Sequence, residues 1–498
     1  MQNGTRLAAV DLGSNSFRLE IGYLDHGLIH PTEYFKETVR QGNGLDTERN
    51  LSADAMQRGW DCLARFGERL RGFRKTQVRA VATQTLREAR NRDVFLARAE
   101  AILGFPIEVI AGREEARLIY QGVSRHLPQN LERRLVVDIG GRSTELILGR
   151  GFETQALESY RVGSVAWSMR YFPEGEFTEQ SFAMAEIAAK AVLDEALQIY
   201  PRKSWDVAYG ASGTIGAVGD VLLAAGWPPG VIDQAGLDWL LEKLLKAQSA
   251  DRLRLEGMKE DRRTVISGGL SVLRALFDLL QIQEMQVAQG ALRHGALYDL
   301  LDREHLNTDL RTSSVERLAA NFHTDARQAQ RVSEAALALL QQALPELDEQ
   351  SPECQELNWA AQLHEIGNAI SHSDAHKHGA YIIDNADATG FTMDELHRLS
   401  QLVLGHKGKL KKLEVDAQDA SFTAQLMALR LAVILCHARR EPRTEGLKLS
   451  FQPNKGVFNL QLPQGWASQF PQSAHLLREE CVAWQKTAWN LSLHLQAS

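Results

Sequence analysis

The sequence predicts an α/β protein made of two related lobes, followed by a mostly helical domain and a small α/β tail. A strand–turn–strand pattern occurs twice, as LAAVDLGSNSFRLEIGYL at 7–24 and as LVVDIGGRSTELILG at 135–149. From about residue 306, apolar residues recur at spacings of three and four, which is typical of packed amphipathic helices. The segment 445–498 contains short strands and a helix. We therefore expect the lobes at 1–130 and 131–305, the helical domain at 306–442 and the tail at 443–498.

The composition is that of a globular, multidomain protein. Its 498 residues are enough for several domains of about 100–200 residues each. A formal net charge of −7 argues against coating of nucleic acid through bulk charge, so we expect no nucleic-acid partner. No secretory signal is recognisable, and no apolar run approaches the roughly 18 residues of a spanning helix. We therefore expect a cytoplasmic protein without an integral membrane segment. The cysteines form no CxxC pair, which argues against a disulfide framework and a thiolate zinc site: Cys62, Cys354, Cys436 and Cys481.

The two strand–turn–strand copies match residue by residue. Aligning Asp11 with Asp138 also aligns three further pairs, which are Gly13 with Gly140, Ser16 with Ser143, and Leu19 with Leu146. Each copy alone could be an ordinary hairpin, because Asp, Gly, Ser and Asn are common turn residues. The matched pair favours two related α/β halves that face one another.

The chemistry of these turns suits phosphate. Glycines let the backbone approach a ligand, and successive turn N–H groups form an anion-binding concavity to which Ser and Thr hydroxyls add donors. An Asp at a strand end, such as Asp11 or Asp138, offers a hard oxygen ligand for Mg²⁺. The candidate phosphate-binding residues are Ser14, Asn15 and Ser16 in the first turn, and Gly140, Gly141, Arg142 and Ser143 in the second.

Two further small-residue turns follow in order. YGASGTIGAVGDV at 209–221 runs from a strand into a helical pattern, which would place Gly210, Ser212 and Gly213 at a helix N-terminus, a natural anion site. In VAQGALRHGALYDLL at 287–301, Gly290 follows a strand and Gly295 lies inside the next helix. One such turn is weak support for phosphate binding, but four in order are strong support.

Taken together, these segments resemble the actin, sugar-kinase and heat-shock-chaperone superfamily of two-lobed phosphate binders. Within it, the chain is similar to the exopolyphosphatase and guanosine pentaphosphate phosphohydrolase family. The resemblance rests on DLGSNSFRLEI, ATQTLREARN at 82–91, AGREEARLIYQGV at 111–123, VVDIGGRSTELILG, YGASGT and QGALRHGALYDLL. It covers residues 7 to about 300 and implies two actin-like, ribonuclease H-like lobes.

The resemblance also implies the catalytic carboxylates. In AGREEARLIYQGV we expect Gly112 to end a strand and Glu114 and Glu115 to lie in the first turn of a helix, where the helix dipole favours acidic residues even without a function. The second glutamate of this EEAR motif matches the catalytic carboxylate of the family, which makes Glu115 the general base for attack of water on a terminal phosphoryl group. Asp138 and Glu145 are the expected catalytic and metal-side carboxylates, with Asp11 as a third ligand for Mg²⁺.

Two arginines, Arg87 and Arg142, lie at motif positions next to the expected phosphate site. Thr83 and Arg87 of ATQTLREARN match positions that line the phosphate cleft in the family, and an Arg fork suits phosphate oxygens. Arg142 stands where the family more often has a third glycine. The sequence therefore does not decide which backbone conformation the second turn adopts.

The second half resembles the HD metal-dependent phosphohydrolase fold but departs from it at the metal ligands. His323 and the pair His364–Glu365 match the pattern, with Glu in place of the hallmark Asp, and the last metal Asp is replaced near Val433 in a helix expected at 428–440. We therefore interpret this domain as a degenerate, HD-like scaffold. In the tail we expect strands at 447–451 and 457–462 and a helix at 474–489.

The densest basic run of the chain lies in this half, around His406. It contains Lys407, Lys409, Lys411 and Lys412. One hypothesis is a track for polyphosphate, in which case neutralising all four lysines raises KM more for long chains than for short ones. The alternative is a solvated loop.

The resemblance implies an exopolyphosphatase that releases terminal orthophosphate from inorganic polyphosphate with Mg²⁺ as cofactor. The alternative within the family is the 5′-phosphohydrolase of guanosine pentaphosphate (pppGpp), which yields the tetraphosphate, and the resemblance also implies a homodimer. Two other classes stay open: a kinase, which product analysis with ATP would reveal, and a non-catalytic sensor, which the combined presence of Glu115, Asp138 and Glu145 argues against.

Overall fold

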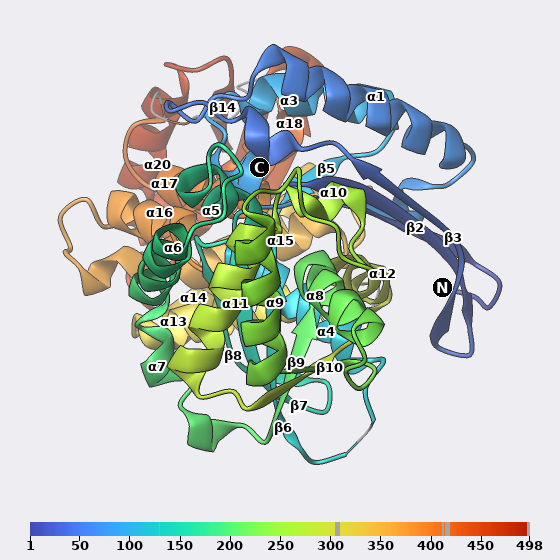
Figure 1. Ribbon diagram of the computed structural model, residues 1–498. Coiled ribbons are helices and arrows are strands. Elements are labelled where there is room, and N and C mark those ends of the chain that lie inside the picture. The colour runs from blue at the N-terminus through green and yellow to red at the C-terminus, as the bar shows by residue number, and fades with distance from the viewer. Residues whose placement is uncertain (129, 304–308, 411–412, 414–418, 496–498) are drawn as a thin grey trace. The chain divides into compact units, whose positions relative to one another are not determined.

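In the computed structural model, which describes residues 1–128, 130–303, 309–410, 413 and 419–495, each repeated segment forms the first hairpin of a β-sheet (Figure 1). Contacts divide the chain into the units Met1–Asp309 and Leu310–Ser498, and each is described by itself. None of the described helices is both long and apolar enough to cross a lipid bilayer.

The first sheet has the strand order β3-β2-β1-β4-β5, in which β1, β2 and β3 are antiparallel and β4 and β5 continue in parallel. Its strands are β1 (Arg6–Leu12), β2 (Ser16–Asp25), β3 (Leu28–Thr38), β4 (Val78–Ala82) and β5 (Ile107–Val109). The helices of this segment are η1 (Gln41–Gly44), α1 (Ala53–Arg69), η2 (Lys75–Gln77), α2 (Gln84–Glu88), α3 (Arg92–Leu103) and α4 (Gly112–Ser124). The predicted strand end at Gly112 is wrong, because Gly112 is already the first residue of α4.

The second sheet has the order β10-β11-β9-β6-β7-β8. Its strands are β6 (Arg133–Ile139), β7 (Thr144–Arg150), β8 (Glu153–Tyr160), β9 (Val207–Ala211), β10 (Val231–Asp233) and β11 (Glu284–Val287). The helices of this segment are α5 (Ser164–Tyr171), α6 (Glu179–Leu193), α7 (Ala196–Ile199), η3 (Arg202–Ser204), α8 (Ser212–Ala224), α9 (Gln234–Ala247), α10 (Glu260–Arg263), α11 (Ile266–Leu280) and α12 (Leu292–Asp302).

The two sheets share one topology. In each, three antiparallel strands are followed by two that are parallel to the first, and the second sheet adds β10 at its edge. This repetition confirms the prediction of two related α/β lobes. The central strands β1 and β6 are buried after their first residue, as expected for strands covered on both faces.

Helices α4 and α12 connect the two lobes (Figure 1). They pack against each other, and α4 also contacts β7 and β8 of the second sheet, whereas α12 contacts β1 and β4 of the first. One hydrophobic cluster joins Val81 of β4, Ile119 of α4 and Val136 of β6. The N-terminus of α4 is therefore held by both lobes.

The second unit is mostly helical and ends in a three-stranded sheet, which confirms the predicted helical domain and α/β tail. Its helices are α13 (Leu310–Asn321), α14 (Ala326–Ala343), α15 (Pro352–Leu363), η5 (Ile366–Ala369), α16 (Ala375–Asp384), α17 (Met393–Gly405) and α18 (Ala420–Leu435). The tail contains β12 (Lys448–Gln452), η7 (Pro453–Lys455), β13 (Val457–Leu462), α19 (Trp466–Gln469), α20 (Pro471–Trp484) and β14 (Asn490–Leu495).

Two boundaries differ from the prediction. The helix expected at 428–440 begins earlier and ends at Leu435, before Arg439 takes a left-handed conformation. The helix expected at 474–489 ends at Trp484, where the Thr487 hydroxyl donates to the Trp484 carbonyl, and the chain then forms β14, parallel to β13. Ala488 continues the apolar spacing of α20, so periodicity alone does not mark the end of that helix.

Candidate active site

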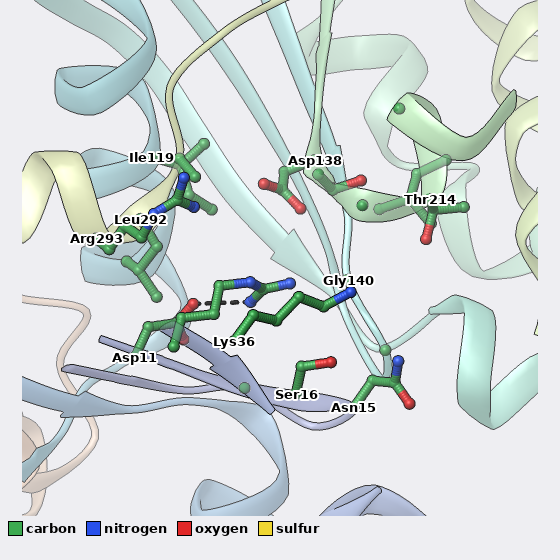
Figure 2. A pocket seen from close by; sticks show the side chains of 18 of the residues that line it. Asp11, Asn15, Ser16, Lys36, Ile119, Asp138, Gly140, Thr214, Leu292 and Arg293 are labelled. Carbon is green, nitrogen blue, oxygen red and sulfur yellow. Dashed lines mark hydrogen bonds and ion pairs between the residues drawn. The ribbon is translucent and has the colours of Figure 1, made fainter. Parts of the chain in front are cut away.

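A cavity of about 710 Å³ opens in the unit Met1–Asp309 (Figure 2). Both repeated turns, the first turns of α4 and α8, and the start of α12 line it. The cavity brings together twelve of the predicted site residues: Asp11, Ser14, Asn15, Ser16, Thr83, Glu115, Asp138, Gly140, Gly141, Ser143, Ser212 and Gly213.

The two repeated turns have the same geometry and touch each other. A Cβ added to Gly13 would lie 3.0 Å from the Ser16 carbonyl oxygen, and one added to Gly140 would lie 3.1 Å from that of Ser143. A Cβ on Gly141 would lie 2.9 Å from the Cβ of Ser14, closer than real side chains approach. A glycine at 141 is therefore what allows the turns of the two lobes to meet.

Two buried polar side chains of the first turn have atoms without a hydrogen-bond partner among the described residues. The Asn15 Nδ2 and Ser16 Oγ atoms are buried and have no hydrogen-bond partner in the described part of the chain. The neighbouring Ser14 hydroxyl, in contrast, accepts a hydrogen bond of 2.7 Å from Thr85. Buried donors without partners are costly, so the turn is suited to a ligand that supplies acceptor oxygens.

The third predicted turn also reaches the cavity. Ser212 has a φ of 90°, a left-handed conformation, and begins α8 directly after β9. This conformation lets Ser212 and Gly213 line the cavity at the N-terminus of α8, where backbone N–H groups favour an anion. Gly210 does not line it, because it lies within β9, packed against Ile215 and Met285.

Glu115 lies in the first turn of α4, as predicted, and is 7% exposed. Gly112 allows this turn to approach β8, since a Cβ at 112 would lie 2.6 Å from the Cβ of Ser159. The Arg87 Nη1 donates a hydrogen bond of 2.9 Å to the Glu115 Oε2. Burial raises the pKa of Glu115; the Arg87 guanidinium opposes that shift, and Asp11 adds to it. A buried carboxylate with a raised pKa on the wall of a cavity is suited to accept a proton.

Asp138 and Glu145 face each other across the hairpin of β6 and β7. Burial, together with the nearby charge of Glu115, raises the pKa of Asp138 to about 7. Glu145 does not line the cavity; it is 1% exposed and accepts a 2.7 Å hydrogen bond from the Ser159 hydroxyl. Burial, then Glu115 and Asp138, hold the pKa of Glu145 well above its usual value.

Arg87 and Arg142 do not line the cavity either. The guanidinium of Arg87 is used by Glu115, by the Ile110 carbonyl and by Gln84. The guanidinium of Arg142 pairs with Glu88 at 3.0 Å and donates to the Gly42 carbonyl at 3.1 Å. Both arginines therefore fix protein groups beside the site.

The alignment of the two turns contains a functional residue that the sequence analysis missed. Aligning Asp11 with Asp138 also places Arg18 at the position of Glu145. Arg18 lines the cavity, and its Nη1 donates a hydrogen bond of 2.9 Å to the Asp11 Oδ2. The hairpin of the first lobe thus carries a carboxylate–guanidinium pair where that of the second carries two carboxylates.

Further cationic and polar groups line the cavity away from the turns. They are Lys36, His126, Lys259, Arg262, Arg293 and His294. Arg293 and His294 also pair with Glu20 of β2. Only Arg293 and His294 lie inside a quoted motif, QGALRHGALYDLL. The position of Lys36 and Arg262 depends on strand pairing and on the packing of the lobes, for which the sequence carries no local signal.

The carboxylates at the site fit Mg²⁺. No group of three or more His, Cys, Asp or Glu side chains among the described residues has the spacing of a closed metal cage. Mg²⁺ needs no such cage, since it is usually held by one or two carboxylates together with water and substrate phosphate oxygens. Asp138 and Asp11 line the cavity, and the pKa of Asp138 is raised first by burial and then by the charge of Glu115, so a bound cation would favour its ionised form.

The predicted groups of the second unit are placed as follows. Lys407 and Lys409 are exposed, whereas Lys411 and Lys412 lie outside the described residues. His364 is buried with its Nδ1 2.6 Å from the Ala361 carbonyl oxygen, and Glu365 pairs with Arg439.

Comparison with known proteins places these features in context. The model of the Ppx/GppA phosphatase family matches residues 23–304, and that of domain III of Ppx/GppA phosphatases matches residues 310–481. The chain is 38% identical over 489 residues to guanosine-5′-triphosphate,3′-diphosphate pyrophosphatase of Vibrio atlanticus, covering 98% of this chain and 97% of the relative. It is 39% identical over 490 residues to the protein of the same name from Vibrio cholerae, with the same coverage. An exopolyphosphatase structure from Cytophaga hutchinsonii shares the fold, with a TM-score of 0.53 and 24% identity over 60% of this chain and 98% of that one.

Proposed function

Since the chain belongs to the Ppx/GppA phosphatase family, we propose that it is a phosphoanhydride hydrolase whose principal substrate is guanosine-5′-triphosphate,3′-diphosphate. The reaction releases the terminal 5′ phosphate as orthophosphate. One observation carries the proposal: two phosphate-type turns from opposite lobes meet at a cavity whose wall also carries Glu115 and Asp138.

The choice of substrate rests on the sequence relatives. The pyrophosphatases of Vibrio atlanticus and Vibrio cholerae match nearly the whole chain at 38% and 39% identity. Their names favour the nucleotide, which the sequence analysis kept as the alternative, over inorganic polyphosphate, which it placed first. The likeness to exopolyphosphatase structures concerns the fold alone.

In the proposed mechanism, the turns bind the terminal phosphate through their backbone N–H groups and the Asn15 and Ser16 side chains. Glu115 orients a water molecule and accepts its proton while the water oxygen bonds to phosphorus. The bond from that phosphorus to the bridging oxygen breaks, and the bridging oxygen leaves with the remaining diphosphate. Arg87 holds the Glu115 carboxylate in place by its hydrogen bond to the Oε2 atom. Positioning and charge neutralisation supply most of the acceleration in reactions of this type.

Asp138, Asp11 and Glu145 are the carboxylates that would hold Mg²⁺, with Glu145 behind Asp138. When bound there, the metal neutralises charge on the phosphate oxygens. Neighbouring residues hold these carboxylates: Ser159 orients Glu145 by its hydrogen bond, and Arg18 fixes Asp11 by another.

Inorganic polyphosphate is the second candidate substrate, because its terminal bond has the same chemistry. The cations that line the cavity beyond the turns, Lys36, Lys259, Arg262 and Arg293, suit a substrate with several phosphates in series.

The test compares orthophosphate release by wild type, Glu115→Gln and the control Glu153→Gln, in which an exposed glutamate of the same unit is changed. We expect Glu115→Gln to lower kcat by about 10²–10⁴-fold, the usual contribution of a general base, while the control retains its activity. A higher kcat/KM for polyphosphate than for the guanosine pentaphosphate would reverse the order of the two substrates. A fully active Glu115→Gln would contradict the mechanism whatever the substrate.

A further inference from the structure

One ion pair crosses from the first lobe to the second at the cavity. The Lys36 Nζ on β3 lies 2.9 Å from the Asp261 Oδ2 on α10. Their side chains are 27% and 25% exposed, and Lys36 lines the cavity. The catalytic steps proposed above use neither residue, and Lys36 was named there only as one of the cations that suit several phosphates.

Strand register directs Lys36 to the site. Asp11 of β1 pairs with Arg18 of β2, and Arg18 pairs with Lys36 of the edge strand β3. Residues directly opposite one another on neighbouring strands share a face of the sheet, so the three side chains form a row. Neighbouring strands are about 4.8 Å apart, which puts the backbone of Lys36 about 10 Å from that of Asp11. Lys36 is thus in the same row as Asp11 and Arg18, on the edge strand.

Asp261 faces an excess of positive charge. Lys36 is close enough to Arg262 and Arg18 for both cations to disfavour its charged form. Arg262 and Lys259 also lie near Asp261, and there they favour the charged form of the carboxylate. The Arg262 Nε lies 3.9 Å from the Asp261 Oδ2, and Lys259 has Asp220 3.6 Å away. Asp261 therefore lies near three cations, Lys36, Arg262 and Lys259, of which Lys259 also pairs with Asp220. A phosphate oxygen offers the same acceptor chemistry with more charge.

We propose that Lys36 binds a phosphate group of the substrate other than the one hydrolysed, and that Asp261 holds Lys36 in the free enzyme until this phosphate displaces it. The proposal rests on the proposed function, since it names a further specificity-determining contact of the same cavity. The carboxylate competes with the substrate, so its removal strengthens binding, whereas removal of the lysine weakens it.

The experiment is a double-mutant cycle in the full-length protein. The variants are Asp261→Asn, Lys36→Met and the double variant, with Asp278→Asn as the matched control. Asp278 forms an ion pair with Lys190 between α6 and α11, and neither residue lines the cavity. Each Asp→Asn change removes one negative charge from the same lobe, so a general charge effect would appear in both.

We expect Asp261→Asn to lower KM about three- to tenfold and Lys36→Met to raise it by a similar factor, with kcat within about twofold, as for coupled neighbours. In the Lys36→Met background, Asp261→Asn should have no further effect. The effect of Asp261→Asn should shrink at high salt, because the contact is between partly exposed charges. A KM for Asp261→Asn equal to that of the control, or an undiminished effect without Lys36, would overturn the proposal.

The substrates used identify the phosphate. The cycle is measured with guanosine pentaphosphate, with GTP and with long-chain polyphosphate. A coupling present with the pentaphosphate but absent with GTP assigns Lys36 to the 3′-diphosphate, whereas an equal coupling with both assigns it to the 5′ chain. Calorimetric binding of guanosine pentaphosphate to the same variants, each combined with Glu115→Gln, provides a readout without turnover. If no substrate releases orthophosphate, the proposed function fails, and the binding cycle still decides whether Lys36 and Asp261 are coupled through the ligand.

Discussion

Glu115 is a buried carboxylate whose charge is regulated by an arginine on the first lobe. Burial raises its pKa, Arg87 opposes this shift, and Asp11 adds to it. All the contacts of the Arg87 guanidinium described above are with protein groups. The sequence pattern suggested a phosphate ligand at this position, and the geometry favours a residue that positions the base.

Arg87→Gln tests this difference. Without Arg87, burial and Asp11 act unopposed, so the pKa of Glu115 rises further. We expect the acid limb of the kcat/KM profile to move to higher pH, and the loss of activity to be larger at pH 6 than at pH 9. Arg90→Gln, which changes an exposed arginine of the same segment, should leave the profile unchanged. A raised KM with an unmoved acid limb would instead assign Arg87 to the phosphate.

Asp138 links the site to stability. Its pKa is about 7 in the folded chain against a usual value of 3.8, so the folded state keeps a proton that the unfolded state releases. The free energy of unfolding must therefore fall as pH rises from about 4 to about 7, and stay low above that range. At about 1.4 kcal/mol for each pKa unit, the loss is on the order of 4 kcal/mol.

We expect Asp138→Asn to melt at a higher temperature than wild type at pH 8 in a chelator, and at the same temperature near pH 4. Added Mg²⁺ should stabilise wild type more than the variant, because the ligand carboxylate is present only there. Thermal unfolding followed by circular dichroism at both pH values measures this. Equal melting temperatures at pH 8 would show that the ionised Asp138 carboxylate does not destabilise the fold.

At the level of elements, α4 carries the base and depends on close packing against α12. A Cβ on Gly295 of α12 would lie 1.8 Å from the Leu118 carbonyl oxygen of α4, and one on Gly122 of α4 would lie 2.3 Å from the Ala291 carbonyl oxygen. The two backbones therefore approach more closely than any side chain permits. This approach sets the distance of α4, and with it Glu115, from the first lobe.

Gly295→Ala should push the helices apart. We expect a destabilisation of about 1–3 kcal/mol, typical of overpacking, together with a lower kcat because Glu115 moves with α4. Gly219→Ala in α8 is the control: its added methyl group meets a single side-chain atom, a methyl carbon of Val287 at 3.0 Å, and no backbone. Urea unfolding and orthophosphate release measure the two effects. Wild-type stability and kcat in Gly295→Ala would mean that α4 is not positioned by α12.

The elements also show what the sequence could and could not predict. The turns at Gly13 and Gly140 were predictable, because turn chemistry is local and the repetition doubled the signal. The end of α20 and the strand β14 were not, since Ala488 keeps the helical spacing. Arg18 could have been predicted, because it aligns with Glu145. The contact between Lys36 and Asp261 could not, because it depends on β3 lying at the sheet edge and on the packing of α10.

At the level of the whole molecule, each unit has hydrophobic cores of its own. The core of the second unit runs from Val315 to Leu491 without a residue from the first. The exopolyphosphatase structure from Cytophaga hutchinsonii is matched over 98% of its length by 60% of this chain, so a fold of this size exists as a separate protein. Domains with separate cores can generally fold alone.

We therefore expect residues 1–309 and residues 310–498 to fold when produced separately, each with a cooperative thermal transition. The first fragment should retain orthophosphate release, because every residue of the cavity belongs to it. A first fragment that folds but releases no phosphate would assign part of the active site to the second unit.

The two hairpins carry chemically different residues, Arg18 and Glu145, at matched positions. Two identical lobes assembled as a symmetric pair would present the same residue twice at this position, either two guanidinium groups or two carboxylates. A site with one of each requires two copies that can change independently of each other. In this chain both copies lie in one polypeptide, so the two sides of the site can carry different residues at matched positions.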